Sequence, residues 1–83
     1  MLKLEFTDME TFFEWIEEEN PPGERYFTSM KDREGYIKVI AVVQSSRRRA
    51  YVIETIPEDE YDEITEKLAE LDFFYVTKIE GLK

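Results

Sequence analysis

The chain has 83 residues, a mass of 10.0 kDa and 42% hydrophobic residues, which is enough for one small hydrophobic core and too little for two. Eleven Lys and Arg residues stand against 20 Asp and Glu residues, so the formal net charge of −9 argues against a general nucleic-acid binder. The sequence contains no Cys and no His. Disulfides, zinc sites of the Cys/His kind and the commonest general base are therefore excluded.

The first twenty residues predict a strand followed by a helix. Apolar and charged residues alternate over residues 1–6, which is the pattern of a strand with one buried face. Thr7 and Glu10 have the spacing of a capping box, so we expect a helix to begin there. Apolar residues recur every three or four positions over residues 9–16, and Asn20 followed by Pro-Pro-Gly predicts the end of this helix.

The middle of the chain predicts three strands joined by two tight turns. The strands are expected at residues 26–31, 36–44 and 48–56, where β-branched and aromatic residues are frequent. Residues 32–35 have Asp at the first and Gly at the fourth position, as a type I turn prefers, and residues 45–47 would form the second hairpin loop. The three strands should therefore form an antiparallel meander.

The C-terminal third predicts a second helix and a last strand. Pro57 followed by three acidic residues is typical of a helix start, and the helix should continue to about Asp72. Residues 73–79 read as a strand. The resulting order, β-α-β-β-β-α-β, predicts one α+β domain over residues 1–83, a two-layer sandwich with the meander in the centre and both helices on one face. The order resembles ferredoxin-like and double-stranded RNA-binding topologies, an analogy that carries no function.

A symmetric loop at residues 45–47 would fix the register of the meander. Ile40 would then lie opposite Val52, and across the first turn Phe27 would lie opposite Ile40. We therefore expect Phe27, Ile40 and Val52 to form an apolar row on the sheet face away from the helices, where it would serve as a partner or homodimer surface. Alternatively, the last strand covers this row. The face beneath the helices would carry Tyr26, Met30, Ile37, Val39, Ala41, Tyr51 and Ile53.

Charge is unevenly distributed along the chain. Residues 1–24, 25–53 and 54–83 carry net charges of −7, +5 and −7, so the helices should be acidic and the meander basic. The first helix tolerates repulsion between acidic residues that are four positions apart. We predict that it presents a surface for a basic partner, although a solvated face is the alternative. The acidic residues of this surface are Glu10, Glu14, Glu17 and Glu18.

Two further charged segments were weighed as binding sites. Arg47, Arg48 and Arg49 follow two serines at the expected hairpin tip, where guanidinium groups could contact phosphate. A solvated or internally paired loop is the alternative reading. The acidic run 58–63 lacks the glycine and the spacing of an EF-hand loop, so we expect no metal site and no cofactor.

The composition favours an interaction protein over an enzyme. No residue set for catalysis can be identified, because the serines have no histidine to activate them. We therefore expect a small regulatory protein, an inhibitor or adaptor that occupies a basic surface of a partner, with a homodimer as a further expectation. The alternative is a nucleic-acid or nucleotide-binding module that uses residues 47–49 and the basic face of the meander. No apolar run approaches the length of about 20 residues that spans a bilayer, which suggests a cytoplasmic location, and the scarcity of Asn and Gln suggests a thermophile.

Overall fold

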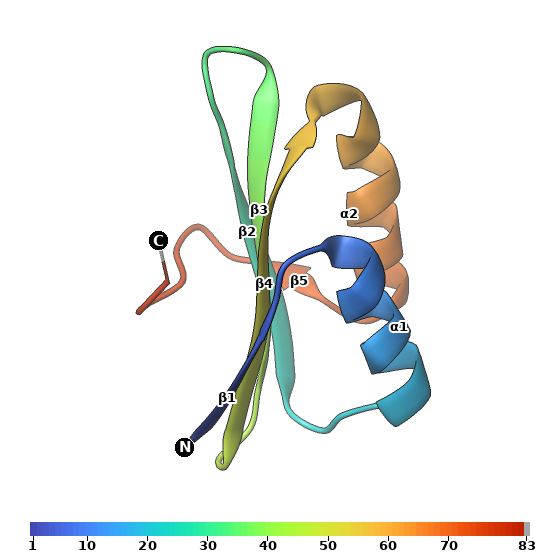
Figure 1. The fold of residues 1–83 in the computed structure, drawn as a ribbon, viewed down its shortest axis with the longest axis vertical. Coiled ribbons are helices and arrows are strands. Elements are labelled where there is room, and N and C mark those ends of the chain that lie inside the picture. Colours follow the sequence, from blue (N-terminus) through green and yellow to red (C-terminus); the bar gives the residue numbers. More distant parts are fainter. Residues whose placement is uncertain (83) are drawn as a thin grey trace.

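The computed structural model describes residues 1–82 and follows the predicted order of helices and strands (Figure 1). Lys83, the last residue of the expected domain, lies outside the described residues. Within residues 1–82, no helix is both long enough and apolar enough to cross a membrane. The elements are β1 (Leu2–Phe6), α1 (Met9–Glu19), β2 (Glu24–Lys31), β3 (Tyr36–Gln44), β4 (Arg48–Pro57), the 3-10 turn η1 (Glu58–Glu60), α2 (Tyr61–Glu70) and β5 (Phe74–Tyr75).

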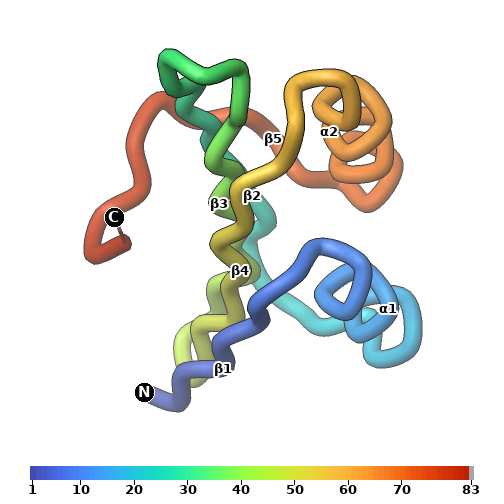
Figure 2. The backbone as a smooth tube through the Cα atoms, turned by 45° about the horizontal axis from the view of Figure 1, so that its top comes forward, coloured from blue at the N-terminus to red at the C-terminus, as the bar shows by residue number. Residues whose placement is uncertain are grey.

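The strands form one mixed sheet with the order β1-β4-β3-β2-β5. Strands β2, β3 and β4 are the antiparallel meander, while β1 runs parallel to β4 and β5 runs parallel to β2. The crossovers through α1 and through α2 advance in the same direction across the sheet, so a common handedness places both helices on the same face. Figures 1 and 2 show this two-layer arrangement, which confirms the predicted sandwich.

The start of α1 differs from the predicted capping box. Asp8, rather than Thr7, is the N-cap residue, and its Oδ2 accepts a hydrogen bond from the Thr11 amide at 3.0 Å. The Met9 amide donates to Oε1 of Glu54 at 2.7 Å. The capping-box prediction was therefore wrong, because Asp8 and not Thr7 caps the helix. The partner of the Met9 amide comes from β4, and a local sequence motif cannot reveal so distant a partner.

The C-terminal ends of both helices are tied together by Arg25 of β2. Asn20 adopts the left-handed conformation with φ of 43° and ends α1, as the sequence predicted. The Arg25 guanidinium donates to the carbonyl of Pro21 at 3.0 Å and to the carbonyl of Leu71, just after α2, at 2.9 Å. Because helix C-terminal ends are partially negative, this cation is well placed to fix how the two helices sit on the sheet.

The second hairpin is shorter than the symmetric loop that we expected. Ser45 donates its amide to the Arg48 carbonyl at 2.9 Å, so only two residues form the tip. Two-residue loops are the commonest connections in hairpins. The register of β3 and β4 consequently shifts by one residue, and Ile40 lies opposite Ile53 instead of Val52.

The first hairpin shifts by one residue as well. The Asp32 amide donates to the Tyr36 carbonyl at 2.9 Å, and Gly35 adopts a left-handed φ of 87°, which leaves a three-residue loop. Phe27 therefore lies opposite Ala41 and not opposite Ile40. Because side chains alternate between the two faces of a strand, a shift of one residue moves a whole set of side chains to the other face.

The expected apolar row is therefore wrong. Phe27 and Val52, which are 7% and 0% exposed, belong to the core beneath the helices, whereas Ile40 lies in a separate cluster with Val42 on the other face. The prediction for the helix face was correct for Ile37, Val39 and Ala41. It was wrong for Tyr26, Tyr51 and Ile53, which join the Ile40 cluster, and for Met30, which is 70% exposed.

The C-terminal segment covers the sheet face away from the helices. Only Phe74–Tyr75 of the predicted strand 73–79 pairs with β2, and the chain then passes to the other face of the sheet (Figure 1). There Ile79, which is 6% exposed, packs in the cluster of Ile40 and Val42, with Val76 and Leu82 against it. The alternative prediction, that the last strand covers this face, is closer to the observed structure, because Val76 and Ile79 belong to the predicted strand 73–79.

Candidate functional site

Figure 1 shows that α1 and α2 lie over the same sheet face and run in the same direction. A groove lies between these two helices. The cavity has a volume of about 720 Å³. Its apolar floor consists of Met9, Phe13, Ile56 and Ile64. Of residues 1–82, the charged ones that line it are seven carboxylates and one cation: Asp8, Glu10, Glu54, Glu60, Glu63, Glu66, Glu70 and Lys67. We call this feature the acidic groove.

The spacing of charged residues in α2 explains one wall of the acidic groove. Glu63, Lys67 and Glu70 follow one another at intervals of four and three residues, so they form a single stripe on the helix surface that faces α1. Glu17 of α1, which lies beside the groove, forms an ion pair with Lys67 at 3.2 Å. Both side chains are partly exposed, so this ion pair adds little stability. It does, however, occupy Lys67, the cation of the groove lining within residues 1–82.

Two of the groove carboxylates have a structural task. Asp8 caps α1, and Glu54 accepts from the first helical amide, that of Met9. Both negative charges also favour the partially positive N-terminal end of the helix. Glu63 and Glu70 on the α2 wall are different, because neither of them forms an ion pair within residues 1–82.

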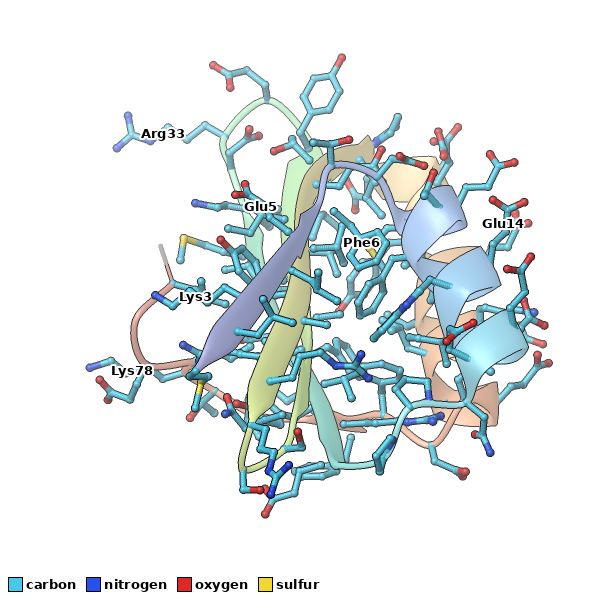
Figure 3. All side chains as sticks on the ribbon, turned by 60° about the horizontal axis from the view of Figure 1, so that its bottom comes forward. Lys3, Glu5, Phe6, Glu14, Arg33 and Lys78 are labelled. Atoms are coloured by element: carbon cyan, nitrogen blue, oxygen red, sulfur yellow. The ribbon has the colours of Figure 1, made fainter. Side chains whose placement is uncertain are left out.

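The structure divides the four acidic residues that the sequence analysis assigned to partner binding. All four are exposed. Glu10 lines the acidic groove and Glu17 lies beside it in the ion pair with Lys67. Glu14 and Glu18 lie outside the groove, and Figure 3 shows Glu14 directed away from the sheet. The sequence analysis did not identify the α2 wall, although the spacing of Glu63 and Glu70 was a signal for a common helix face.

The three arginines expected at the hairpin tip do not gather at one surface. The guanidinium of Arg48 lies 5.2 Å from the centre of the Trp15 ring on the helix side. Arg49 donates from Nη2 to the carbonyl of Glu80 at 2.6 Å, in the C-terminal segment on the other side. Arg47 is exposed at the tip. Successive strand residues point to opposite faces, so Arg48 and Arg49 are directed to different sides of the sheet.

One titratable group on the sheet face away from the helices has a shifted pKa. The Tyr51 hydroxyl donates to Oε1 of Glu5 at 3.2 Å. Burial raises the pKa of the Tyr51 phenol above its usual value, and the charge of Glu5 and the hydrogen bond to it raise the pKa further, whereas Arg49 lowers it. The Glu5 side chain is thereby oriented along the outer sheet face.

The acidic groove combines apolar side chains with charged side chains in its lining. Within residues 1–82, no group of three or more acidic side chains is arranged to hold a metal ion. Comparisons with protein-family models, with curated proteins and with solved structures gave no match. The properties of the groove itself are therefore the basis for a functional proposal.

Proposed function

We propose that the protein is a small non-enzymatic interaction protein that binds a basic, amphipathic segment of a partner protein in the acidic groove. The observation that supports this proposal is the combination of an apolar floor with seven carboxylates and a single cation along the walls. Apolar side chains of the partner would lie on the floor near Phe13 and Ile64, while its Lys or Arg residues would pair with the walls.

Electrostatics would determine the choice of partner and the speed of binding. The net charge of −9 attracts a basic segment before contact and disfavours acidic competitors. Glu63 and Glu70 are available for pairing because neither takes part in an ion pair within residues 1–82. A protein that covers a basic segment in this way acts as an inhibitor or an adaptor of its partner.

The test compares two double variants with the same change in charge. Glu63→Gln with Glu70→Gln removes two groove carboxylates, and Glu14→Gln with Glu18→Gln removes two exposed carboxylates outside the groove. The probe is a fluorescein-labelled synthetic helical peptide with Leu along one face and Lys along the other, and its Kd is measured by fluorescence anisotropy. We expect the groove variant to bind about tenfold more weakly, from about 0.7 kcal/mol for each lost pair.

The outer variant should change the Kd by less than about twofold, because its carboxylates lie outside the predicted contact. Circular dichroism melts of both variants establish that the fold is retained. Equal losses in the two variants would show that the peptide responds to overall charge and not to the groove. Wild-type affinity in the groove variant would likewise exclude the proposed site.

A further inference from the structure

Strand β1 is an edge of the sheet and has an unpaired side. Among residues 1–82 it pairs with β4 alone, and the Leu2 amide donates to the Arg47 carbonyl at 3.0 Å. Amides of alternate residues point to the same side of a strand, so the backbone groups of Lys3 and Glu5 face away from β4. Figure 3 shows their side chains directed away from the helices and Phe6 directed toward them.

The charge pattern of this edge is complementary to itself. We infer that β1 pairs with β1 of a second copy, antiparallel and with Leu4 at the two-fold axis. Lys3 of each copy then lies opposite Glu5 of the other, and the outward backbone groups of both residues complete the hydrogen bonds of the ladder.

The alternative antiparallel registers are less favourable. In any other antiparallel register that still pairs the outward backbone groups, one β1 strand is displaced along the other by an even number of residues. One such shift places Lys3 against Lys3, and the opposite shift places Glu5 against Glu5, and like charges directly opposite each other destabilise a sheet. The sequence of this edge therefore selects a single register.

Neighbouring side chains support the same register. Leu2, which is 59% exposed, would lie beside Phe6 of the second copy on the helix side of the joined sheet. Within the chain, Lys3 lies next to Arg49 across the ladder, and no ion pair of Lys3 is present within residues 1–82. Glu5 of the second copy would supply the countercharge to Lys3, while its Oε1 keeps the hydrogen bond from Tyr51 of its own chain.

The opposite sheet edge is a poorer site for self-association. Strand β5 has two residues, Phe74–Tyr75, before the chain passes to the other face, so it offers few free backbone groups. Pairing through β1 joins the two sheets into one and places both acidic grooves on the same side of it, because an antiparallel two-fold preserves the faces of a sheet. This dimer does not depend on what the grooves bind.

The experiment is a charge exchange measured by sedimentation equilibrium of the full chain. Wild type should dimerise at high micromolar concentration, and Lys3→Glu or Glu5→Lys should each weaken the dimer about tenfold or more, since the two-fold axis places each change at two contacts. The double variant, which restores opposite charges across the axis, should recover the dimer. Lys78→Glu, on an exposed residue that lies beside residues of β2 and β3, is the matched control and should leave the dimer unchanged.

Circular dichroism melts show whether each variant retains the wild-type fold. A monomeric wild type, single variants that dimerise as strongly as the wild type, or a folded double variant that stays monomeric would each overturn the proposed pairing. Equal weakening by Lys78→Glu would assign the effect to net charge and would overturn it as well.

Discussion

Replacing Glu54 by alanine is expected to destabilise the protein through helix α1. The change removes the carboxylate that accepts the Met9 amide at 2.7 Å, and Met9 is only 1% exposed, so water cannot readily replace the lost partner. A hydrogen bond to a charged group contributes about 1.5–3 kcal/mol. Glu54 and Asp8 both line the acidic groove, and relief of the repulsion between their carboxylates offsets part of this loss. The net decrease in the free energy of unfolding should therefore be about 1–2 kcal/mol.

The assay is thermal unfolding followed by circular dichroism. In a chain of this size each kcal/mol shifts Tm by about 4–8 °C, so Glu54→Ala should lower Tm by about 5–15 °C. Glu14→Ala is the control, because Glu14 is exposed and outside the groove, and it should leave Tm nearly unchanged. A Tm for Glu54→Ala within about 2 °C of the wild type would refute the assignment of this carboxylate to the stability of the helix.

Three other outcomes can be tested with single substitutions. Asp8→Ala should reduce stability by about 1 kcal/mol in denaturant unfolding and Thr7→Ala by much less, whereas equal effects would contradict the observed N-cap. Ile79→Ala should cost about 2 kcal/mol, because it removes a buried side chain from the cluster that covers the outer sheet face, and the variant should bind the dye ANS more strongly. The raised pKa of Tyr51 contributes stability that is fully present below about pH 10, the pKa of an unfolded tyrosine, and is lost as the pH rises through the folded value. Phenolate absorbance, compared with a Tyr51→Phe reference, should show this pKa falling when Glu5 is replaced by Gln, and no fall would exclude the carboxylate as a cause.

The order of the elements could be predicted because it depends on local patterns. The spacing of apolar residues over 9–16 and the Asn20 stop predicted α1, and the turns expected at residues 32–35 and 45–47 predicted β3 with its observed bounds. These signals depend on residues within a few positions of one another. The cap supplied by Glu54 was missed because its partner Met9 is 45 positions away.

The register of the sheet was decided by the closure of its loops. Ser45 bonds to Arg48 and leaves a two-residue tip, where a three-residue loop would have fitted the same residue types. A difference of one residue exchanges the faces of a strand, and for this reason Phe27 lies in the core while Ile40 faces the C-terminal segment.

The sequence by itself determined the element order, the acidic character of the helices and the absence of any Cys or His chemistry. Only the tertiary structure brought Glu10 into one groove with Glu63 and Glu70. The crossovers from β1 to β2 and from β4 to β5 place α1 and α2 side by side over the meander. The tertiary structure likewise left β1 as an edge with Lys3 and Glu5 facing outward. Charge and periodicity are properties of the local chain, whereas a groove and a free edge arise from the way distant segments pack together.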